Sequence, residues 1–325
     1  MKRFNKIMCV VDSEKTMTTA LTQAVRIAQD HQADITFISV LKQASAWRKS
    51  FFSREQWGEI HNEFIAKKRS AIEHKLLSIA PSLKADILVT SGIGFIEIIK
   101  HAVRGQYDLV VKCAEDVDWM DRMLGSEDMH LLRKCPYPVL MLKPEHKDSF
   151  RNVLATVDIN DDFSELDENR VQEQLNERVL EYSAALSIAE LSELHIGGVW
   201  DAYAEDLLRH GAFSSTPDDK VDQYVEQTRL ACSSRLEILV KKMATMLGKA
   251  TVQYLQPRPH LVKGTASKEI PLMVETYGID LIVMGTVGRA GITGFIIGNT
   301  AESILEQTQC SILAIKPDGF KTPIE

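Results

Sequence analysis

Glycines at a fixed spacing make the segment from Gly285 to Thr300 the part of the chain best suited to hold phosphate. Gly285 and Gly288 are separated by two residues, Gly288 and Gly298 by nine, and Asn299 follows. Glycine permits a positive φ and close approach of a ligand, so that successive backbone N–H groups can surround an anion. A helix predicted to begin near Asn299 adds the positive end of its dipole. The spacing therefore predicts a phosphate site that needs no lysine.

The elements that must position this loop alternate between short apolar runs and helical patterns. Runs of Val, Ile and Leu without polar alternation are typical of central parallel strands covered on both faces. The runs are residues 7–11, 109–111, 139–142, 153–157, 281–284 and 312–315. Residues 270–277 have helical spacing, with Ser267 as the expected N-cap and Pro271 in the expected first turn. The alternation predicts an α/β fold with doubly wound, open parallel sheets.

The pattern occurs twice in the 325 residues. Four residues of the first half recur 172 positions later (264 − 92), and the starts of the halves match at an offset of 146 (150 − 4), so the second half carries insertions. The recurring pairs are Gly92 and Gly264, Glu97 and Glu269, Ile98 and Ile270, and Asp108 and Asp280. We predict two domains, residues 1–145 and 150–320, each with a five-stranded sheet.

The glycine spacing and the repeat together resemble the universal stress protein family, over nearly the whole chain. The nucleotide motif of that family is Gly, two residues, Gly, nine residues, Gly and then Ser or Thr; here the last position is Asn299. Asn can still donate to a phosphate, so the departure is mild. Asn299 and Glu302 also fit a capping box, which is the alternative role. The resemblance implies two tandem Rossmann-like domains of the adenine nucleotide alpha hydrolase type.

The resemblance also implies a ligand, ATP accompanied by Mg²⁺, in the second repeat. Asp158, at the end of the first strand of that repeat, would meet the adenosine, and the backbone of Val199 would meet the adenine. The residues that would hold the phosphates are Gly285, Gly288, Gly298, Asn299 and Thr300. In open sheets ligands bind where the strand order reverses, which the resemblance places between the first and fourth strands. For Asp158 a turn or cap role is the alternative.

The first repeat departs from the motif. Gly285 corresponds to Cys113 and Gly288 to Asp116 at the offset of 172, and the surrounding residues are acidic. Clustered carboxylates repel a triphosphate, so we predict no ATP there. The first repeat would be a pairing scaffold or bind a different ligand. Asp12, the counterpart of Asp158, is expected to be a cap or turn residue, with ligand contact as the alternative.

Three further groups of residues are weaker candidates for a functional site. Carboxylates and one histidine between positions 115 and 130 fit no defined metal spacing, which favours solvated charge; they are Glu115, Asp116, Asp118, Asp121, Asp128 and His130. Cys135 lacks a partner base and is interpreted as a buried small residue. An aromatic stretch favours packing, with an apolar ligand pocket as the alternative; it contains Trp47, Phe51, Phe52, Trp57, Ile60 and Phe64.

Composition excludes several classes of protein. The net charge of −7 without a basic stripe argues against nucleic acid as a partner. No apolar stretch reaches the roughly 18 residues of a membrane span, and no signal peptide is recognised. Five cysteines without a Cys-x-x-Cys pair fit reduced thiols. We expect a cytoplasmic protein with no membrane partner.

The expected function is a stress-response protein that binds ATP and couples occupancy to a partner or a conformational change. Slow ATP hydrolysis is left open, because no P-loop and no water-activating base is found. One alternative is an ATP-using enzyme of a related fold; another is a module that binds a lipid-like or other small molecule in an apolar pocket. The resemblance further implies resistance to DNA damage. Residues 139–142 and 312–315 are expected to pair as an intramolecular pseudo-dimer, with a homodimer as a further option.

Overall fold

Strands and helices alternate through the chain as the sequence predicts. The structure is a computed structural model that describes residues 4–43, 51–114, 126–144, 149–160, 166–211, 216–286 and 297–324. The chain divides into two units. The N-terminal unit contains the described residues up to Ser149, together with Ile297 and the segment from Gln309 onward. The C-terminal unit contains the other described residues, from Phe150 to Thr308.

The sheet of the N-terminal unit takes five strands from the first repeat and one from the second. They are β1 (Lys6–Val10), β2 (Asp34–Lys42), β3 (Asp86–Gly92), β4 (Leu109–Cys113), β5 (Val139–Leu142) and β10 (Ser311–Ile315). Their order is β3-β2-β1-β4-β5-β10, and the first five are parallel. β10 runs antiparallel to β5, with Ile312 opposite Met141. The expected pairing of these two segments is confirmed.

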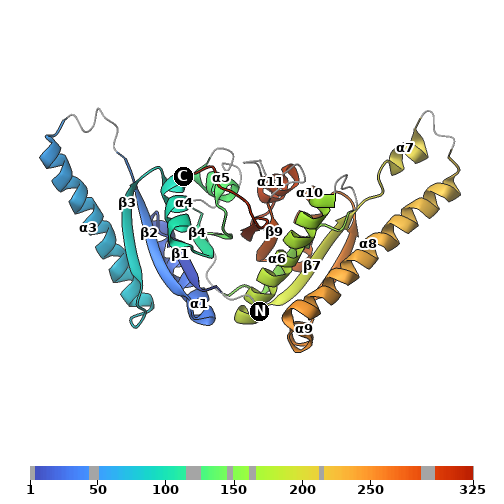
Figure 1. The fold of residues 1–325 in the computed structure, drawn as a ribbon, viewed down its shortest axis with the longest axis horizontal. Helices are drawn as coiled ribbons and strands as arrows, with labels where there is room; N and C mark the ends of the chain where they lie inside the picture. Colours follow the sequence, from blue (N-terminus) through green and yellow to red (C-terminus); the bar gives the residue numbers. More distant parts are fainter. Residues whose placement is uncertain are drawn as a thin grey trace. The chain divides into compact units, whose positions relative to one another are not determined.

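Helices cover both faces of this sheet (Figure 1). They are α1 (Glu14–His31) and α3 (Arg54–Ile79) on one face, and α4 (Gly94–Gly105) and α5 (Glu127–Lys134) on the other. Right-handed crossovers require this division, because the chain moves first to one side of β1 and then to the other. Every residue of β4, β5 and β10 is buried, which explains why these strands are apolar apart from Lys112 and Ser311.

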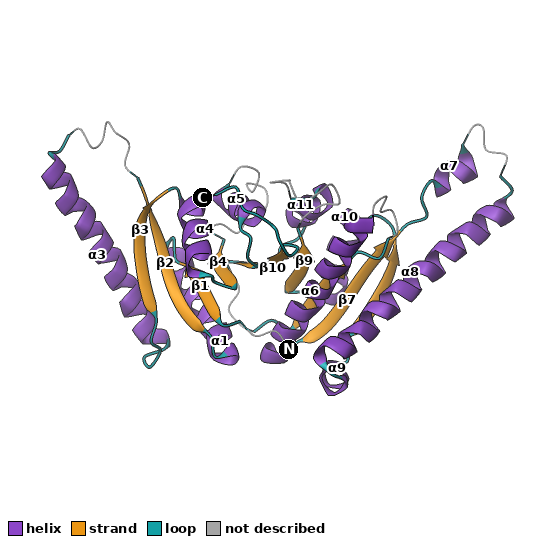
Figure 2. Ribbon diagram, in the orientation of Figure 1, coloured by secondary structure: helices purple, strands orange, loops and turns teal. Residues whose placement is uncertain are grey.

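The C-terminal unit repeats this winding with four parallel strands. They are β6 (Asn152–Val157), β7 (Glu193–Trp200), β8 (Arg258–Lys263) and β9 (Leu281–Gly285), in the order β9-β6-β7-β8. Its helices are α6 (Leu166–Glu190), α7 (Glu205–His210), α8 (Asp218–Leu247), α9 (Lys249–Leu255), α10 (Ala266–Tyr277) and α11 (Asn299–Gln307). α6 and α8 lie on one face, and α10 and α11 on the other (Figure 2). Among the described helices, none is long and apolar enough to cross a membrane.

The expected start of α10 is wrong by two residues. Thr265, not Ser267, is the N-cap, and Pro271 therefore lies inside the helix instead of in its first turn. A proline there cannot donate to the carbonyl four residues before it, which is that of Ser267. The Ser267 carbonyl instead accepts a hydrogen bond from the Gln307 side chain of α11, at 3.1 Å. The carbonyl of Ser267, which lacks a donor within α10, thus links α10 to α11.

Candidate functional site

The carboxyl ends of β9, β6 and β7 bring three of the predicted site residues to one edge of the C-terminal sheet. β6 pairs with β9 on one side and with β7 on the other. Asp158 directly follows β6, Gly285 ends β9, and Val199 is the second-last residue of β7. The strand order therefore reverses between β6 and β9, which is the position where open α/β sheets bind ligands.

The first turn of α11 is tied to the end of β9. The backbone N–H of Gly298 donates to the carbonyl of Thr286 at 3.2 Å, and Gly298 is the N-cap of the helix. Asn299 and Thr300 are exposed residues of the first helical turn. The capping-box role of Asn299 is wrong, because Asn299 lies inside the helix and the N-cap makes no side-chain hydrogen bond. Gly288 lies outside the described residues.

Packing supplies a reason for Gly285 that the sequence did not indicate. A Cβ atom on Gly285 would lie 2.5 Å from Cδ2 of Leu175 on α6, and the residue has no positive φ. A distance that short forces the neighbour to move. Glycine at this position therefore lets α6 pack closely on the end of β9, whether or not a ligand is bound.

Asp158 is held in a turn by its neighbours. Its Oδ1 accepts from the backbone N–H of Asn160 at 3.1 Å. The buried amide of Asn176 accepts from the Asp158 N–H at 3.0 Å and donates to the Asp158 carbonyl at 2.7 Å. The turn role considered for Asp158 is thus present. Asn176 was missed by the sequence analysis, although an Asn among the apolar positions of a helix is a usable signal.

The carbonyl of Val199 has a partner within the same unit. It accepts from Nδ2 of Asn160 at 3.2 Å, and the Ile159 side chain packs where a side chain at Gly198 would lie. A primary amide N–H is the same kind of donor as the amino group of adenine. An adenine at this edge would therefore exchange places with the Asn160 amide.

The same edge of the N-terminal sheet contains an ion triad instead. The ammonium of Lys112 on β4 lies 2.6 Å from Oδ2 of Asp12 and 2.9 Å from Oδ1 of Asp128. Burial lowers the pKa of Lys112, but the charges of and hydrogen bonds with Asp128 and Asp12 outweigh it, so the pKa lies above its ordinary value. Lys112 is therefore a fixed cation at the point where the strand order of the first repeat reverses.

This triad distinguishes the two repeats. At the offset of 172, Lys112 corresponds to Met284, so the second repeat has no ammonium at that position. Lys68 of α3 adds a second bond, donating to the Asp12 carbonyl at 2.8 Å. Lys112 was not predicted as a site residue; its signal in the sequence is a lysine within an otherwise apolar strand. The acidic residues 115–121, on which the argument against ATP rested, lie outside the described residues.

Comparison with known proteins identifies the two repeats. The universal stress protein family matches residues 3–143 and again residues 166–316. The chain belongs to the universal stress protein family. It is a tandem member with two universal stress domains of the Rossmann-like α/β type, in a family of stress-response proteins.

Its relatives include full-length matches. The universal stress protein E homolog of Haemophilus influenzae is 26% identical over 97% of this chain and 98% of its own length. Universal stress protein E of Photorhabdus laumondii is 24% identical over 100% and 99%. A universal stress protein from Archaeoglobus fulgidus has the same fold, with a TM-score of 0.59 at 19% identity over 97% of each chain.

The remaining candidate residues that the structure describes do not assemble a second site. Cys135 is buried, which raises the pKa of its thiol to about 12 and leaves it a poor nucleophile. His130 stacks on Phe95. Within the described ranges no three His, Cys, Asp or Glu side chains are placed to hold a metal, and four of the six suspected ligands lie outside those ranges.

The aromatic stretch packs only in part, because Trp57 and Ile60 are half-buried while the three described phenylalanines are exposed. Phe51 is 74% exposed and Phe64 58% exposed, and Ile72 and Leu76 are the residues of α3 that are buried. Trp47 lies outside the described residues. The amino-terminal half of α3 thus leaves apolar side chains in solvent, and an apolar ligand there stays a prediction.

Proposed function

We propose that the second universal stress domain binds ATP with Mg²⁺ at the carboxyl ends of β6, β7 and β9, and that occupancy regulates a partner. The observation that carries the proposal is the hydrogen bond from Gly298 N–H to Thr286, which holds the start of α11 beside the end of β9. Backbone N–H groups and the helix dipole favour a phosphate there. Five free cysteines are compatible with a role in the cytoplasm.

The residues at this edge fit a nucleotide in chemical type. Asn299 and Thr300 are exposed donors beside the positive end of α11, and a carboxylate at Asp158 suits a ribose hydroxyl or a Mg²⁺-bound water. The adenine amino group would replace Asn160 at the Val199 carbonyl. No described residue here is assigned as a general base, so the proposal is binding; stress response and resistance to DNA damage would follow from the regulated partner.

The first universal stress domain is not part of this proposal. Lys112 is buried at the corresponding position, and its ammonium already pairs with Asp12 and Asp128, so its charge is used within the domain. One nucleotide per chain is the expected stoichiometry.

A matched pair of variants tests the proposal by titration calorimetry with ATP and Mg²⁺. Asn299→Asp places a negative charge in the first turn of α11, and we expect the affinity to fall by at least about tenfold. Ser126→Asp places a negative charge at the start of α5 in the first domain; Ser126 is the N-cap of α5, a role that Asp also fills, so affinity should not change. Failure of the unaltered protein to bind ATP, or equal affinity in Asn299→Asp, would refute the site.

A further inference from the structure

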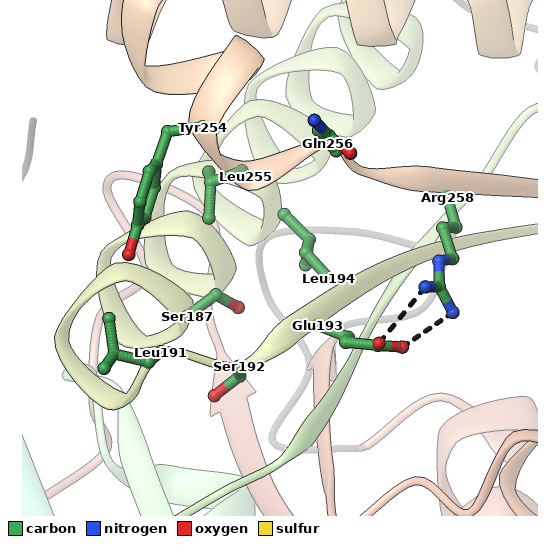
Figure 3. A pocket seen from close by; sticks show the side chains of 9 residues that line it. All are labelled: Ser187, Leu191, Ser192, Glu193, Leu194, Tyr254, Leu255, Gln256 and Arg258. Atoms are coloured by element: carbon green, nitrogen blue, oxygen red, sulfur yellow. Dashed lines mark hydrogen bonds and ion pairs between the residues drawn. The ribbon is translucent and has the colours of Figure 1, made fainter.

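A pocket of about 320 Å³ opens at the other edge of the C-terminal sheet, by the amino ends of β7 and β8 (Figure 3). The last turn of α6 and the end of α9 form its walls. Leu194 and Leu255 contribute buried apolar surface, while Leu191 and Tyr254 lie at its rim. Ligand pockets typically begin at about 300 Å³, so this one has the size for a one-ring or two-ring molecule.

A buried hydroxyl without a partner lines the pocket. The Ser187 side chain is 1% exposed, and its Oγ makes no hydrogen bond to any described residue. Ser183, one turn earlier on α6, instead donates to its own helix at the Val179 carbonyl, at 2.7 Å. A buried hydroxyl without a partner is unfavourable, and among the described residues Ser187 Oγ has none, so a donor or an acceptor brought by a ligand would satisfy it.

Two apolar side chains at the rim of the pocket are exposed to solvent, which is unfavourable for both. Tyr254 is 62% exposed and Leu191 is 77% exposed, and Figure 3 shows the Tyr254 ring extending from α9 toward Leu191. Leu191 has a φ of 57°, in the left-handed region that glycine usually fills after a helix. Leucine costs stability at this position, and it places an apolar group opposite the tyrosine ring.

The charges at the pocket compensate one another. Arg258 Nη1 lies 2.6 Å from Oε2 of Glu193, and Nη2 donates to Oε1 at 3.1 Å. In this bidentate ion pair the charges of Arg258 and Glu193, which would otherwise attract an ionic ligand, neutralise each other. A neutral molecule therefore suits the pocket better than a charged one.

We propose that this pocket binds a small neutral aromatic molecule with one hydrogen-bonding group. The aromatic ring of the ligand lies between Tyr254 and Leu191 and packs on Leu194 and Leu255. Its polar group forms a hydrogen bond with Ser187 Oγ. The site is separate from the proposed ATP site, since the two lie at opposite ends of the strands of one sheet.

Indole is a suitable probe, with two rings and a single N–H donor. Titration of the full-length protein, followed by ligand-observed NMR, should show saturable binding. Tyr254→Ala should weaken it at least about tenfold and Ser187→Ala about threefold to tenfold. Leu191→Gly should weaken binding while raising the melting temperature, a combination that a purely structural role for Leu191 does not produce.

The controls separate this site from other effects. Ser183→Ala removes the satisfied hydroxyl, and Tyr203→Ala removes an exposed tyrosine elsewhere in the unit; both should bind indole as the unaltered protein does. Asn299→Asp should also retain indole binding, so the result is independent of the ATP site. Absence of saturable binding, which is expected if Ser187 contacts only water, or equal affinity in Tyr254→Ala and Ser187→Ala, would overturn the proposal.

Discussion

Lys112 determines the chemistry of the first repeat at the scale of one residue. It lies in a strand whose every residue is buried, and its ammonium contacts Asp12 after β1 and Asp128 on α5. Isolated burial of an ammonium is strongly unfavourable, and paired carboxylates offset that cost. The first repeat thus supplies its own cation where the second is proposed to receive a ligand, and the difference follows from Lys112 in place of Met284.

The variant Lys112→Met copies the second repeat and should destabilise the protein by about 3–5 kcal/mol, because it leaves two carboxylates in a buried site without a counter-charge. Urea denaturation measures the free energy of unfolding. The triple variant with Asp12→Asn and Asp128→Asn removes the stranded charges and should regain most of the loss. Equal stability of Lys112→Met and the unaltered protein would show that the triad is not a stabilising unit.

At the scale of elements, a pair of histidines joins strands β7 and β8 beneath helix α10. Nδ1 of the buried His195 on β7 lies 2.9 Å from Nε2 of His260 on β8, and Tyr277 of α10 stacks on His260. The pKa of His195 is lowered by desolvation and then by the charge of Arg258, while Glu193, 3.8 Å away, acts in the opposite direction. The pKa of His260 is lowered by desolvation, then by His195 and by Arg258. The pair is therefore neutral in the folded protein near pH 7.

Stability should fall as the pH drops from 7 to 5. The unfolded chain takes up protons near the ordinary histidine pKa of 6.5, whereas the folded pair does so at lower pH, so the unfolded state binds more protons in this range and stability rises with pH. The contribution is present above the unfolded-state pKa and is lost below it. The variant His195→Asn with His260→Gln should show a smaller drop in urea denaturation at the two pH values; an unchanged drop would assign it to other groups.

The last strand connects sequence order to architecture at the scale of the whole molecule. β10 belongs to the second repeat in sequence, yet its residues Ile312 to Ala314 pair with β5 of the N-terminal unit. Leu313, in the middle of β10, is fully buried. The N-terminal sheet is therefore complete only when residues 311–315 of the second repeat have joined it.

Leu313→Asp should selectively unfold the N-terminal unit around β5. Burying a carboxylate among apolar side chains costs several kcal/mol, and β5 would lose its partner strand. Hydrogen exchange measured by mass spectrometry should show lost protection at residues 139–142, with protection of β7 and β8 retained. Leu272→Asp, at a site that is 55% exposed, is the control. Uniform loss of protection in both units would contradict the division of the chain into two units.

The amino-acid sequence by itself determined the repeat, the alternation of elements and the edge of the sheet at which a site would lie. These depend on local periodicity and on strand order, and β6 beside β9 follows from the winding of the sheet. Only the tertiary structure decided which side chains contact one another. Lys112 and Asp12 are 100 residues apart, and no periodicity marks contacts between side chains that distant in sequence. For the same reason the sequence did not show that Gly285 lies against Leu175 on α6, whose Cδ2 atom is 2.5 Å from the position that a Cβ atom would take.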